Sequence, residues 1–185
     1  MKNLLLTILM VFSIAKGFAV LPDTYCVKQG YTQDIGVREA TGQNDGIEVE
    51  KYLATTGLGK GFAWCAAFVN YHLTSCGVET PKSPAWSPSW FTANVIYHKG
   101  ELTYRDYGYK RPRSGDVFGI YFKSKQRIAH VGFVDQWPTR NRYLVTVEGN
   151  TNKAGSREGD GVYRKYRLKS QVHKISRWTG SSGIS

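Results

Sequence analysis

Acidic side chains and long apolar segments are both scarce in this chain of 185 residues. Only 14 Asp and Glu residues stand against 25 Lys and Arg residues, so the formal net charge is +11. Beyond residue 19 no stretch resembles a membrane span, and we find no internal repeat and no low-complexity region. The chain is therefore expected to form one globular domain without stable insertion into a membrane.

Residues 1–19 have the pattern of a secretory signal peptide. Lys2 gives a positive start, residues 4–14 are almost entirely apolar, and residues 17–19 offer a small-x-small cleavage site. We expect cleavage after Ala19 and a periplasmic or secreted protein.

A basic exported protein favours an anionic partner, such as the polymers of a cell wall or other anionic envelope polymers. Nucleic acid is the other usual partner of such a charge. Export and the dispersion of the basic residues argue against it, so no nucleic acid is expected. Solvation of an ordinary surface explains much of the charge equally well.

The chain has three cysteines, which leaves at least one unpaired in an oxidising compartment. Cys65 and Cys76 fall on one predicted helix, about 16 Å apart along its axis, whereas a disulfide requires Cα atoms within about 7 Å. Two pairings remain, Cys26 with Cys76 or Cys26 with Cys65. The first leaves Cys65 free to react and is favoured; three free thiols are the remaining alternative.

Helix patterns precede strand patterns along the chain. After a linker over residues 20–33, we expect helices over 35–41, 47–55, 63–75 and 89–97, and strands over 116–122, 129–136, 143–148, 161–168 and 172–178. This order predicts an α+β fold in which N-terminal helices pack on an antiparallel sheet. The folded domain is expected over 34–178 and a flexible tail over 179–185.

Cys65 is the candidate nucleophile. It falls in the first turn of the apolar helix predicted over 63–75, where the helix dipole favours a thiolate. The backbone N–H of Cys65 is a candidate donor to an oxyanion. The competing interpretation is that Cys65 only fills the core, as free cysteines often do.

Four histidines are candidates for the base. His72 lies about 10 Å further along the helix than Cys65, too far for a hydrogen bond. His98 and His173 each stand beside a lysine. His130 lies on a predicted strand, and the presence of Cys65 favours it although a lone strand histidine is more often structural.

Glu148 and Asn150 are candidates to orient His130. They are two residues apart at a strand end, so their side chains leave the same face if the strand continues. Glu148 is the expected orienting group and Asn150 a supporting polar residue near the oxyanion or the histidine. The alternative is that this polar stretch is only a turn.

Aromatic and metal-ligand candidates are weaker. Trp64, Trp86 and Trp90 are candidate substrate-binding residues of a groove, although core packing explains tryptophans about as well. His72 and Cys76 stand at positions i and i+4 of one helix, but no second pair has ligand spacing. We therefore expect no metal and no cofactor.

In combination, several short motifs resemble those of a CHAP domain, the cysteine- and histidine-dependent amidohydrolase/peptidase of bacterial cell-wall enzymes within the papain-like group. The resemblance covers residues 37–178 and rests on these stretches: Val-Arg-Glu at 37–39, Tyr-Leu at 52–53, Thr-Gly-Leu at 56–58, Trp-Cys-Ala-Ala-Phe-Val at 64–69, Gly-Asp-Val at 115–117, Ala-His-Val-Gly-Phe-Val at 129–134 and Glu-Gly-Asn at 148–150. Segments 99–113 and 153–161 look longer than the family usually needs.

The resemblance implies a papain-like α+β fold with Cys65 as nucleophile, His130 as base, and Glu148 with Asn150 as the remaining polar members. It also implies peptidoglycan as substrate and chemistry without a metal or cofactor. We therefore expect a secreted, monomeric peptidoglycan hydrolase that cleaves an amide bond, as an N-acetylmuramoyl-L-alanine amidase or as an endopeptidase. The alternative is a catalytically inactive cationic module that binds the cell wall.

Overall fold

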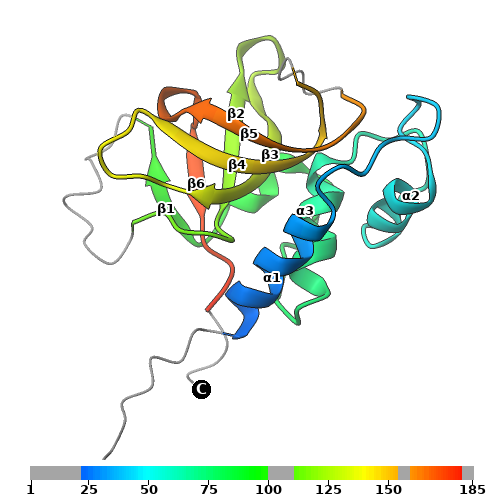
Figure 1. Cartoon of the computed structure of the whole chain (residues 1–185), viewed down its shortest axis with the longest axis horizontal. Coiled ribbons are helices and arrows are strands. Elements are labelled where there is room, and N and C mark those ends of the chain that lie inside the picture. Colours follow the sequence, from blue (N-terminus) through cyan, green and yellow to red (C-terminus); the bar gives the residue numbers. More distant parts are fainter. Residues whose placement is uncertain (1–21, 100–110, 154–158, 181–185) are drawn as a thin grey trace, which may run out of the picture.

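The computed structural model describes residues 22–99, 111–153 and 159–180, and Figure 1 shows the course of the chain. The expected signal peptide and residues 181–185 of the expected tail lie outside these ranges. The helices are α1 (Pro22–Gln33), α2 (Ile47–Ala54) and α3 (Cys65–Thr74), with short 3-10 segments η1 (Ser87–Phe91), η3 (Lys123–Lys125) and η4 (Lys169–Gln171). The strands are β1 (Val95–His98), β2 (Val117–Phe122), β3 (Arg127–Gln136), β4 (Tyr143–Thr151), β5 (Gly161–Leu168) and β6 (Lys174–Ser176).

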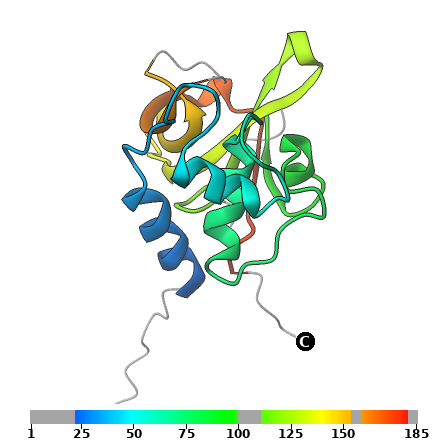
Figure 2. The same ribbon diagram turned by 90° about the vertical axis from the view of Figure 1, so that its right-hand side faces the viewer.

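The strands of the described residues form one sheet in the order β1-β6-β2-β3-β4-β5, and every neighbouring pair is antiparallel. Figures 1 and 2 show the helices gathered on one side of this sheet. Helix α3 lies between the sheet and α2, because it contacts β3 and β4 as well as α2. The α+β fold predicted from the order of helix and strand patterns is confirmed.

The main core lies between α3 and the sheet. Helix α3 is apolar nearly all round, as expected of a central helix, and its Phe68 and Val69 are fully buried together with Phe133 and Val147 of the sheet. A smaller apolar cluster covers the other face of the sheet, around Phe118.

The sheet is curled around this second cluster. The rings of Tyr97, on β1, and Trp137, just after β3, lie 5.7 Å apart even though β6 and β2 separate these strands in the sheet order. The far face of the sheet is therefore concave, and its edge strand β1 approaches the end of β3.

The linker expected over residues 20–33 was wrong, because residues 22–33 form helix α1. Two of its side chains, Val27 and Tyr31, are fully buried, and the Tyr31 ring stacks on Phe133 with centroids 4.9 Å apart. Gly30 lies against α3, where a Cβ atom would come within 2.8 Å of His72. Tertiary contacts therefore stabilise α1, whose own sequence gives a weak helix signal.

Two other expected helices were also wrong. Residues 35–41 run beside β5 instead, because Gly36 has a φ of 105° and Arg38 forms a β-bridge with Gly161. Residues 89–97 divide into the end of η1 and the start of β1, with Asn94 at a φ of 58° between them. Both breaks are left-handed positions that interrupt a helix.

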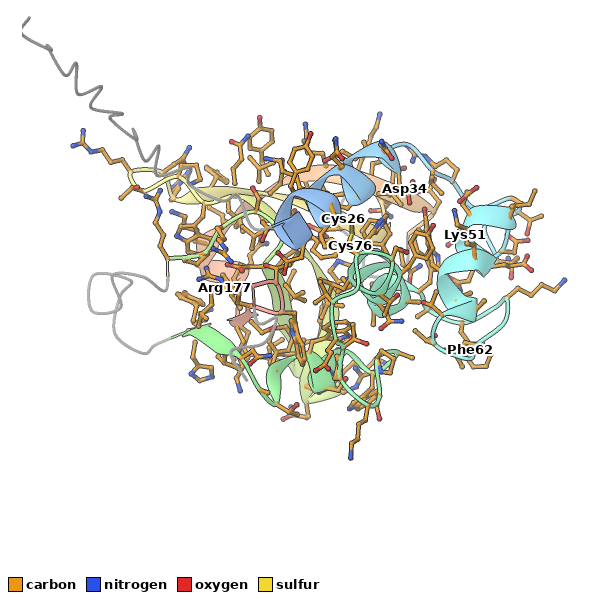
Figure 3. All side chains as sticks on the ribbon, turned by 90° about the horizontal axis from the view of Figure 1, so that it is seen from below. Cys26, Asp34, Lys51, Phe62, Cys76 and Arg177 are labelled. Carbon is orange, nitrogen blue, oxygen red and sulfur yellow. A yellow bond between two sulfur atoms is a disulfide. The ribbon has the colours of Figure 1, made fainter. Side chains whose placement is uncertain are left out.

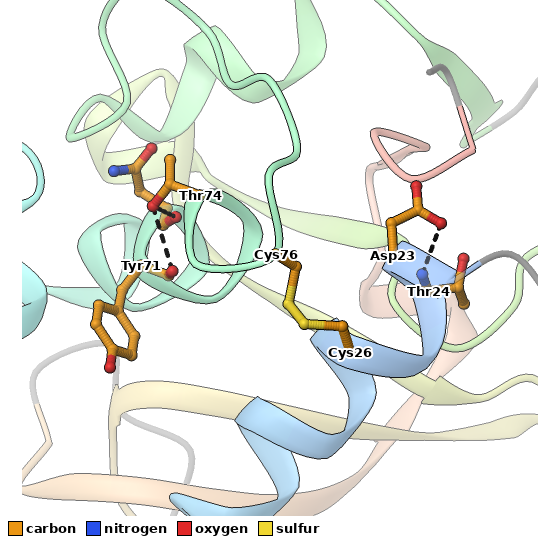
Figure 4. The surroundings of a disulfide bond; sticks show 7 residues. Asp23, Thr24, Cys26, Tyr71, Thr74 and Cys76 are labelled. Carbon is orange, nitrogen blue, oxygen red and sulfur yellow. Dashed lines mark hydrogen bonds between the residues drawn. A yellow bond between two sulfur atoms is a disulfide. The ribbon is translucent and has the colours of Figure 1, made fainter. Parts of the chain in front are cut away.

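Cys26 and Cys76 form a disulfide that ties α1 to the turn after α3 (Figure 4), and Figure 3 shows the same pair from below. Their Cα atoms lie 5.9 Å apart, and Cys65 is the free cysteine. The favoured pairing is therefore the one present. In the described part of the chain, no helix has both the length and the apolar character required to cross a bilayer.

The bridge spans 50 residues, so its removal should lower the free energy of unfolding. We expect the double variant Cys26→Ala/Cys76→Ala to lose about 2–5 kcal/mol, because a cross-link restricts the unfolded chain. Urea unfolding followed by circular dichroism measures this loss, with Cys65→Ala as the control that keeps the bridge. Equal free energies for the double variant and the wild type would contradict it.

Candidate active site

Cys65 is the first residue of α3, and its position is set by contacts of the preceding residue. The backbone N–H of Trp64, the N-cap residue, donates to Asn150 Oδ1 at 3.1 Å. Asn150 has a φ of 54°, and its Nδ2 donates to Asn44 Oδ1 at 3.0 Å and to Gly159 O at 3.1 Å. The structure thus places Asn150 at the start of the helix that carries the candidate nucleophile, where it holds the backbone.

Gly149 allows β4 to lie directly against the start of α3. A Cβ atom at Gly149 would come within 2.6 Å of the Trp64 ring and 2.8 Å of Phe68. A side chain here would push the strand away from the helix. Gly149 of the short Glu-Gly-Asn motif is therefore required by packing.

His130 and Glu148 lie on the neighbouring strands β3 and β4. His130 Nε2 and Glu148 Oε2 are 2.8 Å apart, and both side chains are at most 1% exposed. The other ring nitrogen, Nδ1, makes no hydrogen bond of good geometry, yet the ring lies close enough to Cys65 for each group to shift the pKa of the other. The structure thus brings together a thiol, an imidazole and a carboxylate, in that order.

Two further residues hold the Glu148 carboxylate. Arg167, on β5, donates through Nε to Oε1 and through Nη2 to Oε2, both at 2.5 Å. Thr146 Oγ1 donates to Oε1 at 2.5 Å. Both are buried, so the carboxylate is satisfied on each oxygen within the protein.

Sequence reasoning missed Arg167, which it counted only among the dispersed basic residues. The one available signal was indirect, because a buried carboxylate on β4 requires a positive or donating partner. Which strand supplies that partner depends on the register of β5 against β4. The residue types do not reveal this register.

The charges of the site reinforce one another. Burial alone would raise the pKa of Glu148, but its hydrogen bonds and charge interactions with Arg167 and His130 hold it well below its usual range. Burial also opposes the charged imidazole, yet contacts with Cys65 and Glu148 raise the pKa of His130 to about 9. At neutral pH His130 is therefore an imidazolium.

The pKa of the Cys65 thiol shifts in the opposite direction to that of His130. Burial opposes the thiolate, but His130, then the backbone N–H of Val131 and the hydroxyl of Ser87, more than offset it and lower the pKa of Cys65. A thiolate–imidazolium pair is the resting form that these shifts favour.

Access to the sulfur is narrow. Cys65 is 5% exposed, and its Sγ lies 3.9 Å from the buried Ser87 Oγ at the start of η1. The next residue back, Trp86, is 49% exposed and carries the Arg127 guanidinium 4.0 Å from its ring centroid. Trp86 directly precedes Ser87, and Arg127 is the first residue of β3.

Two of the three tryptophans expected to bind substrate are structural. Trp64 and Trp90 are fully buried. The indole N–H of Trp64 donates to Glu39 Oε1 at 2.8 Å, and that of Trp90 to Pro84 O at 3.0 Å. Of these three described rings, that of Trp86 alone is exposed and open to a ligand.

The remaining histidines lie elsewhere. His72 Nε2 is 3.2 Å from Asp34 Oδ2, and the rings of His98 and His173 are 5.1 Å apart. Cys76 is in the disulfide, so it is not free to act with His72 as a metal ligand. Within the described ranges no three His, Cys, Asp or Glu residues gather as metal ligands do.

Comparison with protein-family models matches residues 57–150 to the CHAP domain. This match spans Cys65, His130, Glu148 and Asn150, and about half of the chain. Searches among curated proteins and among solved structures gave no significant match.

The thiolate of Cys65 should depend on His130. We expect iodoacetamide to alkylate Cys65 at mildly acidic pH, below the ordinary thiol pKa of about 8.5, because the imidazolium stabilises the anion. In His130→Ala the rate at that pH should fall by at least about tenfold, one pKa unit being a tenfold change in thiolate. Mass spectrometry of the labelled peptide measures the rate, since Cys65 is the free cysteine.

The restricted access of Cys65 slows both proteins alike, so the comparison uses the pH dependence rather than the absolute rate. If the alkylation rate had the same midpoint pH in the wild type and in His130→Ala, the proposed ion pair would be contradicted.

Arg167 should stabilise the fold through Glu148. We expect Arg167→Met to lose about 3–5 kcal/mol of unfolding free energy, because it leaves a buried carboxylate unpaired. The double variant Arg167→Met/Glu148→Gln should recover most of that loss, since no buried charge remains. The coupling is measured by a double-mutant cycle, in which urea unfolds the wild type, Arg167→Met, Glu148→Gln and the double variant. Additive losses would show that the two residues do not interact.

Proposed function

The chain belongs to the CHAP domain family, whose members are generally hydrolases of the peptidoglycan amidase and peptidase type, and we propose from this that it is a secreted cysteine hydrolase of peptidoglycan. The observation that carries the proposal is the buried line of Cys65, His130 and Glu148 at the start of α3. Export rests on the signal-peptide pattern of residues 1–19. The scissile amide joins the sugar to the peptide or lies within the peptide.

The chemistry follows from the charges of the resting site. The Cys65 thiolate attacks the amide carbonyl, and the developing oxyanion accepts a hydrogen bond from the backbone N–H of Cys65 at the positive end of α3. His130 then gives its proton to the leaving amine, which leaves a thioester on Cys65.

Hydrolysis of the thioester completes the cycle. Neutral His130 removes a proton from water, the resulting hydroxide attacks the acyl carbon, and the thiolate leaves. Glu148 stays ionised and keeps Nε2 protonated, so that the opposite nitrogen faces Cys65. General acid–base catalysis of this kind contributes about 10²–10⁴ in rate.

Substitution of the nucleophile tests the proposal. We expect Cys65→Ala to reduce release of soluble fragments from purified peptidoglycan by about 10⁴-fold or more, because no covalent intermediate can form. Mass spectrometry of the fragments measures this release and identifies the bond. Cosedimentation with peptidoglycan should be unchanged, as should the melting temperature.

The control is Lys125→Met, which changes an exposed residue on η3. This variant should cleave peptidoglycan at the wild-type rate. Equal release by Cys65→Ala and the wild type would overturn the assignment of Cys65. A wild type that cosediments with peptidoglycan but releases nothing would instead be the inactive wall-binding module.

A further inference from the structure

A cavity of about 410 Å³ opens beside His130, and its wall includes Ile120, which packs against the apolar cluster of the concave face. Strands from both edges of the sheet contribute to it, Arg167 on β5 and Lys99 immediately after β1. Lys99 Nζ donates to the backbone oxygen of Ser170, on η4, at 2.6 Å. This contact joins the two edges of the curled sheet at the cavity.

The described lining of the cavity contains basic groups and no acidic side chain. Its members are Lys99, Ile120, Tyr121, Phe122, Lys123, His130, Arg167, Ser170, Gln171 and His173. Arg167 is committed to Glu148, whereas the ammonium groups of Lys99 and Lys123 each have three donors and lie on exposed residues. An anion inside the cavity would meet these two groups.

His173 reports the positive potential of this region. Burial lowers its pKa, and Coulomb interactions with His98, Lys174 and Lys99 lower it further. A cavity with this potential favours a negative ligand.

The place of the cavity relative to the reaction decides which part of a substrate it meets. His130 delivers its proton to the leaving amine, so the amine-side fragment lies next to the imidazole. The cavity touches His130, whereas Cys65 is not part of its lining. Because the leaving amine and the cavity both adjoin the His130 imidazole, a leaving fragment that extends past the ring would enter the cavity.

We propose that this cavity is a carboxylate-binding subsite, in which Lys99 and Lys123 hold a free carboxylate of the leaving fragment. The proposal rests on the proposed function and adds a preference to it. Among amide bonds, the enzyme favours those whose amine-side amino acid or peptide bears a free carboxylate.

Two forms of one substrate test the preference. The peptidoglycan fragment that the wild type cleaves is prepared with the carboxylates of its leaving portion either free or converted to carboxamides. We expect kcat/KM to be about tenfold or more higher for the free carboxylates, the usual weight of a hydrogen bond between charged groups. In Lys99→Met/Lys123→Met the two forms should be cleaved at equal rates.

The matched control is Lys125→Met, which removes an equal charge from η3 outside the cavity lining and should keep the preference. Equal cleavage of the two forms by the wild type overturns the subsite and leaves the hydrolase intact. A preference that persists in Lys99→Met/Lys123→Met assigns it to the general positive charge and also overturns the subsite. Cleavage of neither form would count against the proposed function.

Binding gives an independent measurement that needs no turnover. In Cys65→Ala, proton NMR follows the titration of His173 with and without the leaving fragment. The carboxylate form should raise the pKa of His173 by supplying a nearby negative charge, and the carboxamide form should leave it unchanged. The same pKa with both forms would overturn the proposal even if the lysine variants failed to fold.

Discussion

The buried carboxylate of Glu148 is the group on which the site depends. An isolated carboxylate without solvent is too costly to stay ionised and would instead take up a proton. The bidentate contact from Arg167 and the hydroxyl of Thr146 offset that cost. Glu148 can therefore remain negative beside His130, which is the condition for a raised imidazole pKa and a lowered thiol pKa.

Strand β4 helps to position both Glu148 and the start of α3, where Cys65 lies. Glu148 faces His130 on the concave side, whereas Asn150, two residues on, accepts the Trp64 N–H that fixes the first turn of α3. Gly149 between them permits close contact with the helix. A shift of β4 would therefore displace the Glu148 carboxylate and the Cys65 thiol together, so packing of one strand controls the alignment of the candidate reacting groups.

The residues with distinctive chemistry could be predicted from the sequence, and the residues whose roles depend on packing could not. Cys65 and His130 could be proposed as partners because a thiol at a helix start and a strand histidine are recognisable types, and the structure places them close together. Helices α2 and α3 and five of the strands follow from ordinary periodicity. Helix α1 was missed because a disulfide and the Tyr31 contact stabilise it rather than its own pattern. The burial of Trp90, like the partner of Glu148, depends on three-dimensional contacts that no local pattern encodes.

In the proposed reaction, Arg167 would also prevent an unbalanced buried charge during turnover. In the resting form Cys65, His130, Glu148 and Arg167 carry alternating negative and positive charges, and they sum to zero. Once the thiolate has become a thioester and the imidazolium has lost its proton, only the Glu148–Arg167 pair remains charged. Without Arg167 both states would hold one uncompensated negative charge, and it would be least tolerable beside the neutral imidazole of the acyl-enzyme. The guanidinium thus keeps Glu148 ionised through both halves of the reaction, so that the imidazole keeps the same orientation when it acts first as an acid and then as a base.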